Sequence, residues 1–176
     1  CMRVCDDLLT NFEDKDKGGF FFTSNQHEQL FYRPKSISDD SVPSGLVYAA
    51  DTLLYMGFIS GNQKYIEAAH GALDFIYKSI DDNLTSSVSA INLLCDDNLE
   101  KEIIIVRTNK KTWEKITDSE EYYAKCIIFI ENELQNLPDY IAIKESKGEF
   151  TSYHCKGMTC QAPKLSFEDF IDNLKT

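Results

Sequence analysis

The sequence predicts a mixed fold: a helical first part over residues 1–99, which also carries a β-hairpin, and a small α/β second part over residues 100–176. In the first part, apolar residues recur at intervals of three and four, the spacing of one helical face. In the second part, two apolar runs flank a helix candidate, the order expected of a parallel strand pair with a crossover helix. The chain has 176 residues, of which 43% are hydrophobic, so it can bury a core.

Residues 1–35 predict a short helix followed by a β-hairpin. The helical face is formed by Val4, Leu8, Leu9 and Phe12. The runs GGFFFT at 18–23 and QLFYR at 29–33 have the composition of strands, and the polar residues 24–28 between them suit a turn. We therefore expect two short paired strands here.

Residues 43–99 predict three helices. Pro43 suits a first helical turn, and an apolar face follows as far as Phe58. Gly61 suits a C-terminal cap and Asn62 the N-cap of a second helix, so the helices over 43–60 and 62–80 should form an αα-hairpin. The third helical face consists of Leu84, Val88, Ile91, Cys95 and Leu99.

Residues 100–176 predict a β, α, β order and a closing helix. EIIIV at 102–106 and KCIIFI at 125–130 are the strand candidates, with a helix through Trp113 between them. YIAIK at 140–144 is a candidate for a further strand, and Ser166 suits the N-cap of a last helix. The turn after EIIIV lacks glycine, which argues against a phosphate-binding loop of the P-loop or Rossmann kind.

Composition and charge exclude two classes of partner. The formal net charge of −11 repels a phosphate backbone, and the lysines are scattered, so we expect no nucleic acid. No apolar run approaches the roughly 20 residues needed to cross a bilayer, and the N-terminus lacks the pattern of a signal peptide, so we expect a cytoplasmic protein without membrane contact. Because the chain begins inside a helical pattern, it reads as a piece of a longer protein.

Three segments in this order resemble one known family. GGFFFTSNQHEQLFYRPK at 18–35, DDSVPSG at 39–45 and YHCKGMTCQAP at 153–163 are similar to the C-terminal part of the YyaL or spermatogenesis-associated family. Its full chains carry a thioredoxin-like domain and an α/α toroid similar to N-acylglucosamine 2-epimerases and six-hairpin glycosidases. The resemblance implies that residues 1–99 are the C-terminal hairpins of an α/α toroid and that residues 100–176 are a small α/β appendage.

One family segment departs from its usual form. The family reads close to DGATPSGN where this chain reads DDSVPSGL; Asp39, Pro43, Ser44 and Gly45 match, whereas Leu46 replaces an amide. This replacement removes a hydrogen-bond donor and an acceptor from the start of an inner toroid helix. It therefore weighs against a sugar contact carried over at that position.

The resemblance implies a candidate site before the long helix, because loops at one end of a toroid line a central funnel. The candidate catalytic residues are His27, Glu28 and Asp39, and the candidate substrate-binding residues are Arg33, Lys35 and Ser44. Carboxylates and a histidine can share acid and base work on a polyol. The alternative is a solvated loop ordered by an ion pair of Arg33 with Asp39 or Asp40, and we favour this structural interpretation.

The cysteines predict neither a metal site nor a cofactor. Cys155 and Cys160 flank KGMT beside His154, but a zinc site needs four ligands, and four intervening residues differ from a thioredoxin motif. We expect a reduced, partly buried pair in a turn. Cys95 and Cys126 lie in apolar runs and suit a core.

Two functions of different class follow. The first is a carbohydrate-active domain, isomerase-like or hydrolase-like, belonging to a thioredoxin-domain-containing protein. The second is a catalytically silent structural or interaction domain of a redox protein. The expected partners are the remaining part of the same chain or a second copy, through an apolar face that includes Leu8, Leu53, Leu54 and Phe58, and a carbohydrate ligand is possible.

Overall fold

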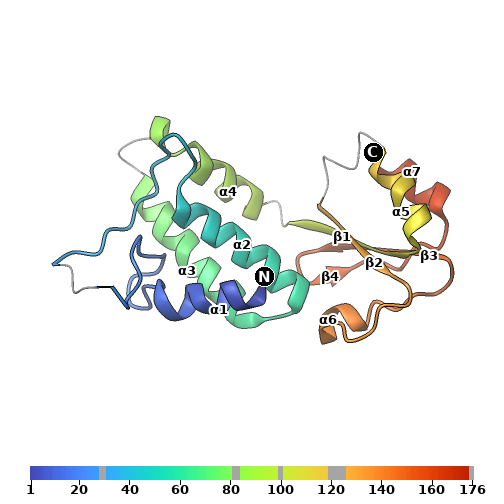
Figure 1. Cartoon of the computed structure of the whole chain (residues 1–176). Coiled ribbons are helices and arrows are strands. Elements are labelled where there is room, and N and C mark those ends of the chain that lie inside the picture. Colours follow the sequence, from blue (N-terminus) through green and yellow to red (C-terminus); the bar gives the residue numbers. More distant parts are fainter. Residues whose placement is uncertain (28–30, 81–83, 99–100, 119–125, 175–176) are drawn as a thin grey trace. The chain divides into compact units, whose positions relative to one another are not determined.

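The computed structural model describes residues 1–27, 31–80, 84–98, 101–118 and 126–174, which form two compact units, Cys1–Leu99 and Glu100–Thr176 (Figure 1). These units have the same bounds as the two parts that the sequence indicates. Each unit has its own buried apolar cluster. The described residues include no helix that is both long and apolar enough to cross a membrane.

The first unit is helical. Its elements are α1 (Met2–Asn11), α2 (Gly45–Ser60), α3 (Gln63–Ser79), the short 3₁₀ helix η2 (Leu84–Ser86) and α4 (Val88–Asn98). The sequence predicted α2 and α3 correctly and a helix at α4. The apolar face predicted for α4 is wrong, because Val88 and Cys95 are exposed, whereas Ala90 and Leu93 are buried. Gly61 ends α2 in the left-handed conformation with φ 69°, and the Asn62 side chain accepts a hydrogen bond from the Lys64 N–H at the start of α3. Pro43 differs from expectation, because Ser44 is the N-cap and Pro43 lies before the helix.

The core of this unit lies between α2 and α3. Ala50, Leu53 and Leu54 of α2 are fully buried, as are Ala69 and Ala72 of α3. The two helices approach closely at Gly57, where an added Cβ would lie 2.5 Å from Cγ1 of Ile66. Small residues on both helices therefore permit the close packing of the αα-hairpin.

The β-hairpin expected over residues 18–33 is wrong for the residues that the structure describes. Phe20 forms a single bridge with Glu13, and the Phe22 N–H donates to the Pro34 carbonyl at 2.8 Å, without a strand on either side. Gly18 and Gly19, with φ of 74° and 78°, turn the chain back along α1 and direct Phe20 into the core. Residues 28–30, where the second expected strand begins, lie outside the described residues.

The second unit contains one four-stranded sheet in the order β2-β1-β3-β4. The strands are β1 (Glu102–Thr108), β2 (Cys126–Glu131), β3 (Phe150–Lys156) and β4 (Thr159–Cys160). β1 and β2 are parallel and are connected through α5 (Lys110–Thr117), as the sequence predicted. β3 pairs antiparallel with β1 on its other side and was not predicted.

Helices α5 and α7 (Phe167–Leu174) pack on one face of this sheet, and the short α6 (Asp139–Ala142) lies on the other side (Figure 1). Their shared cluster consists of Ile104, Val106, Ile116, Phe150, Phe170 and Leu174. Ser166 accepts a hydrogen bond from the Asp169 N–H, which confirms the predicted cap of the closing helix. The strand predicted at 140–144 is wrong: Pro138 is followed by a helical turn whose Ile141 and Ala142 N–H groups donate to its carbonyl at 2.8 Å.

Candidate functional site

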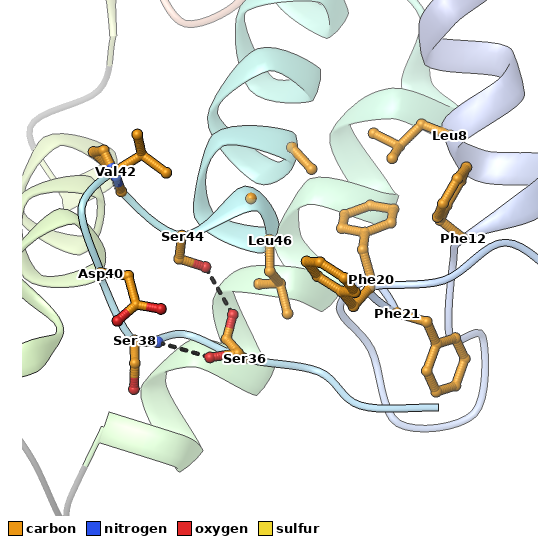
Figure 2. A pocket seen from close by; sticks show the side chains of 14 residues that line it. Leu8, Phe12, Phe20, Phe21, Ser36, Ser38, Asp40, Val42, Ser44 and Leu46 are labelled. Atoms are coloured by element: carbon orange, nitrogen blue, oxygen red, sulfur yellow. Dashed lines mark hydrogen bonds between the residues drawn. The ribbon is translucent and has the colours of Figure 1, made fainter. Parts of the chain in front are cut away.

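An apolar groove in the first unit lies between α1, the segment 20–22, the segment 36–44 and the start of α2 (Figure 2). Its volume is about 400 Å³. The apolar side chains that line it are Leu8, Phe12, Phe20, Phe21, Phe22, Val42, Pro43, Leu46 and Ala49. The polar residues on the wall are Ser36, Ser38, Asp40 and Ser44. The groove therefore presents mainly carbon surface to a ligand.

Two of the three serine side chains on this wall, those of Ser36 and Ser44, already have hydrogen-bond partners within the fold. Ser44 Oγ donates to the Ser36 carbonyl at 2.7 Å and accepts from the Val47 N–H as the N-cap of α2. Ser36 Oγ accepts from the Ser38 N–H at 3.2 Å (Figure 2). Ser44 therefore has a structural role at the start of α2, and its expected role in substrate binding stays a prediction.

Asp39 joins the starts of two helices. Its carboxylate accepts from the Ser44 N–H at 2.9 Å, next to α2, and from both the N–H and the hydroxyl of Ser89 in α4. Burial by itself raises the pKa of Asp39, but hydrogen bonds from Ser89, Ser44 and Val88 outweigh this and hold the pKa below its usual value. The carboxylate is therefore a fixed acceptor, which suits neither a general acid nor a nucleophile.

Lys35 forms a buried ion pair. Its Nζ lies 2.6 Å from Oδ2 of Asp14 and donates to the Gly18 carbonyl at 2.8 Å, and it lies 4.0 Å from the centre of the Phe75 ring. Burial opposes ionisation of Asp14, but the Lys35 ammonium and the N–H groups of Lys17 and Asp16 lower its pKa. The pair holds the Gly18 turn against α3 and leaves little of the ammonium for a substrate.

Arg33 holds the backbone of two segments together. Its guanidinium donates to the carbonyls of Thr23 and Asn11 and lies over the Phe21 ring, 4.1 Å from the ring centre. In the described part of the chain it bonds to these carbonyls rather than to Asp39 or Asp40. The ion pair expected of Arg33 with Asp39 or Asp40 is therefore wrong for the described residues, and Arg33 orders this segment through backbone carbonyls instead.

The candidate residues do not converge on one point. Asp39 and Ser44 meet at the start of α2, whereas Arg33 and Lys35 both lie near the Phe21 ring. His27 is exposed in a bend. Glu28 lies outside the described residues.

A wider polar hollow lies between α1 and α3 and was missed by sequence reasoning. Its volume is about 690 Å³, and its charged lining residues are Asp6, Glu13, Asp14, Lys15, Lys64 and Glu67. Burial raises the pKa of the Glu13 carboxyl, although Lys15 opposes the effect. The nearby Tyr65 hydroxyl donates to Asp6 at 2.6 Å, and burial followed by this contact raises the pKa of Tyr65 to about 12. The run EDKDKGG over 13–19 signals only a turn, so its sequence does not reveal the hollow.

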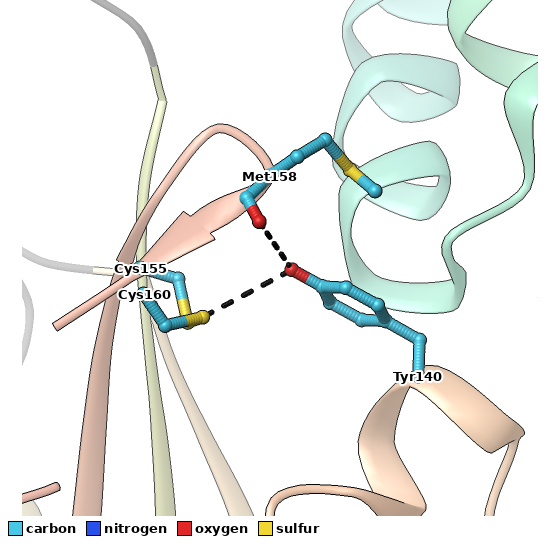
Figure 3. The surroundings of a disulfide bond; sticks show 4 residues. All are labelled: Tyr140, Cys155, Met158 and Cys160. Atoms are coloured by element: carbon cyan, nitrogen blue, oxygen red, sulfur yellow. Dashed lines mark hydrogen bonds between the residues drawn. A yellow bond between two sulfur atoms is a disulfide. The ribbon is translucent and has the colours of Figure 1, made fainter. Parts of the chain in front are cut away.

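Cys155 and Cys160 form a disulfide, so the expectation of a reduced pair is wrong (Figure 3). The two residues lie directly opposite each other on β3 and β4, which brings their side chains together. Cys1, Cys5, Cys95 and Cys126 do not form disulfides. Among the described residues, no group of three or more His, Cys, Asp and Glu side chains has the arrangement of a metal site.

No protein family, curated protein or solved structure matches this chain.

Proposed function

We propose that this chain is a catalytically silent interaction domain whose apolar groove binds a protein segment. The observation that carries the proposal is the use of Asp39, Ser44, Lys35 and Arg33 within the fold, beside a groove of about 400 Å³ lined by carbon. Residues committed to helix caps and backbone carbonyls are poorly placed for proton transfer. The resemblance to the YyaL family supports placing the helical unit at the end of an α/α toroid, where hairpins pack against further helices.

The groove suits an apolar side chain better than a sugar. A sugar ring needs several free hydrogen-bonding groups, and on this wall the hydroxyls of Ser36 and Ser44 already bond to the backbone. Phe22 and Val42 remain 81% and 70% exposed, so a partner would remove their apolar surface from water. Asp40 is exposed on the same wall, and the chain carries a net charge of −11, so a neighbouring lysine or arginine in the partner adds attraction.

The test uses peptides with two or three Leu or Phe residues beside Lys or Arg, titrated into the isotope-labelled full chain. We expect saturable amide shifts centred on residues 20–22 and 36–46. Phe22→Ser should weaken binding about tenfold, the effect of losing one exposed aromatic contact. Tyr77→Ser is the matched control, because Tyr77 is 70% exposed on α3 and lies outside the groove. Equal losses in both variants, or no saturable shifts with any peptide, would contradict the proposal.

A carbohydrate-active domain is the second candidate, and the polar hollow between α1 and α3 favours it. Carboxylates are common ligands of sugar hydroxyls, and a carboxyl with a raised pKa such as Glu13 is suited to donate a proton. Titration with mono- and disaccharides should then shift amides of residues 6–19 and 64–71 and leave the groove unchanged. Glu13→Gln should abolish turnover of a bound glycoside and preserve binding. Absence of sugar binding removes this candidate.

A further inference from the structure

The disulfide in the second unit joins two residues of one hairpin that other contacts also hold. Cys155 and Cys160 are separated by five positions, and Lys156 pairs with Thr159 between them. The Gln161 N–H donates to the His154 carbonyl at 2.9 Å just beyond the bridge. Further along, Lys164 and Ser152 exchange two backbone hydrogen bonds. The hairpin therefore keeps its pairing partners when the sulfur–sulfur bond is broken.

The two cysteine residues differ in exposure. Cys155 is 5% exposed, whereas Cys160 is half-buried. Both line a cavity of about 460 Å³, together with Lys156, Met158 and Gln161. A thiolate entering this cavity reaches Cys160 more readily than Cys155, and exchange requires direct approach to a sulfur.

A phenol hydroxyl lies beside the accessible sulfur. Tyr140 of α6 places its Oη 3.9 Å from Sγ of Cys160 and 3.3 Å from the Met158 carbonyl (Figure 3). Burial raises the pKa of Tyr140, so this hydroxyl keeps its proton near neutral pH. The hydroxyl donates its single proton to the Met158 carbonyl, and on reduction it can donate this proton instead to the thiolate that forms at Cys160.

We propose that Cys155–Cys160 is a reversible thiol–disulfide exchange site in which Cys160 is the reacting sulfur and Tyr140 stabilises its thiolate. In the forward direction a thiolate of a small dithiol attacks Sγ of Cys160, a new sulfur–sulfur bond forms, and Cys155 leaves as a thiolate that takes up a proton. The second thiol of the dithiol then attacks the first sulfur of the dithiol, which is bonded to Cys160 in the mixed disulfide. A disulfide forms within the dithiol, and Cys160 leaves as a thiolate. The dithiol supplies two electrons and becomes a disulfide, while the protein gains two thiols.

The first test treats the folded full chain with dithiothreitol and alkylates the free thiols at intervals. Mass spectrometry of the peptide that contains both cysteines should show reduction while far-UV circular dichroism stays unchanged. Oxidised glutathione should then restore the bond. Reduction that occurs only after denaturant has unfolded the chain would show a buried structural bridge and overturn the proposal.

The second test compares the two sulfurs. Cys155→Ser leaves Cys160 free, and Cys160→Ser leaves Cys155 free. With oxidised glutathione, the mixed disulfide should form about tenfold faster at Cys160 than at Cys155, because Cys155 is 5% exposed. Equal rates in two folded variants, or a faster reaction at Cys155, would contradict the assignment of Cys160.

The third test isolates Tyr140 and does not depend on the cysteine variants folding. In the reduced, otherwise unchanged chain, Tyr140→Phe should slow reoxidation by oxidised glutathione about threefold at pH 7. It should also raise, by about half a pH unit, the pH at which the alkylation rate of Cys160 is half its maximum. Tyr153→Phe is the matched control, because Tyr153 lies in β3 of the same sheet and its hydroxyl donates to the Glu145 carbonyl. An unchanged pH profile in Tyr140→Phe, or an equal change in Tyr153→Phe, would remove the role of Tyr140.

Discussion

At the scale of single residues, side chains of the types used in catalysis instead hold together segments that are distant in the sequence. Asp39 accepts hydrogen bonds from Ser44 and from Ser89, which is 50 positions away in the chain. Lys35 pairs with Asp14, 21 positions away. Such partners are invisible to spacing arguments, because nothing in the local pattern brings them together. The sequence therefore identified the polar residues of the segment but could not supply their partners.

Asp39 gives the first prediction at this scale. Asp39→Ala leaves the N–H groups of Ser44, Val88 and Ser89 and the Ser89 hydroxyl without their acceptor at two helix starts. We expect the free energy of unfolding to fall by about 2–3 kcal/mol, the cost of losing a cap and several hydrogen bonds to a charged group. Asp40→Ala, at the exposed neighbouring residue, is the control, and its free energy of unfolding should change by less than about 0.5 kcal/mol. Urea unfolding measures the free energy of unfolding of both variants. Equal urea midpoints for Asp39→Ala and Asp40→Ala would show that Asp39 does not connect the helices.

At the scale of elements, periodic apolar residues predicted the helices of the first unit, and compact apolar runs predicted β1 and β2. Two elements were not predicted correctly from the sequence. The FFF run at 20–22 has strand composition, but Phe20 is buried in the core and all three rings line the groove beside α1 and α2. β3 carries Thr151 and Ser152, which are fully buried although polar, so its sequence lacks the apolar signal of an inner strand. The Thr151 hydroxyl accepts from the Lys147 N–H, which offsets the cost of its burial.

The contact between the Gly18 turn and α3 gives the prediction at this scale. Gly18 has φ 74°, and a Cβ added there would lie 2.2 Å from the carbonyl oxygen of Gly71. Gly18→Ala must therefore move backbone against backbone, and we expect a loss of more than about 2 kcal/mol in the free energy of unfolding. Gly45→Ala is the control, because a Cβ at this helical position meets no atom within 4 Å and alanine favours the helix. A Gly18→Ala variant as stable as the original chain would show that the turn does not pack this closely.

At the scale of the whole molecule, the change from helical periodicity to apolar runs near residue 100 marks the division between the two units. The toroid, the resemblance to the YyaL family and self-association remain predictions. The apolar face expected for self-association is wrong at Leu53 and Leu54, because both are fully buried in the core of the helical unit. The Cys155–Cys160 bond illustrates the limit of sequence reasoning at this scale. Its formation depends on β3 and β4 placing the two residues opposite each other, and β3 was not predicted.

The two units should differ in their response to acid. Asp14 and Asp39, whose pKa values the fold lowers, both belong to Cys1–Leu99. A lowered pKa in the folded state stabilises the fold fully above the unfolded value, near pH 4, and this contribution is lost as the pH falls through the lower folded value. Glu13 has a raised pKa and therefore acts in the opposite sense, but it is one group against two. We expect the helical unit to lose stability first as the pH falls below about 4.

Two optical signals separate the units in one titration. Trp113, the sole tryptophan, stacks on Phe129 at 4.8 Å and reports only on Glu100–Thr176, whereas α1 to α4 supply most of the helical far-UV signal. The far-UV signal should therefore fall at a higher pH than the Trp113 fluorescence changes. In the double variant Asp14→Asn with Asp39→Asn, the helical unit should be less stable at pH 7, and its stability should depend less on pH between about 2 and 4. Coincident transitions of the two signals in the original chain would show that the two carboxylates do not set the acid stability of the helical unit.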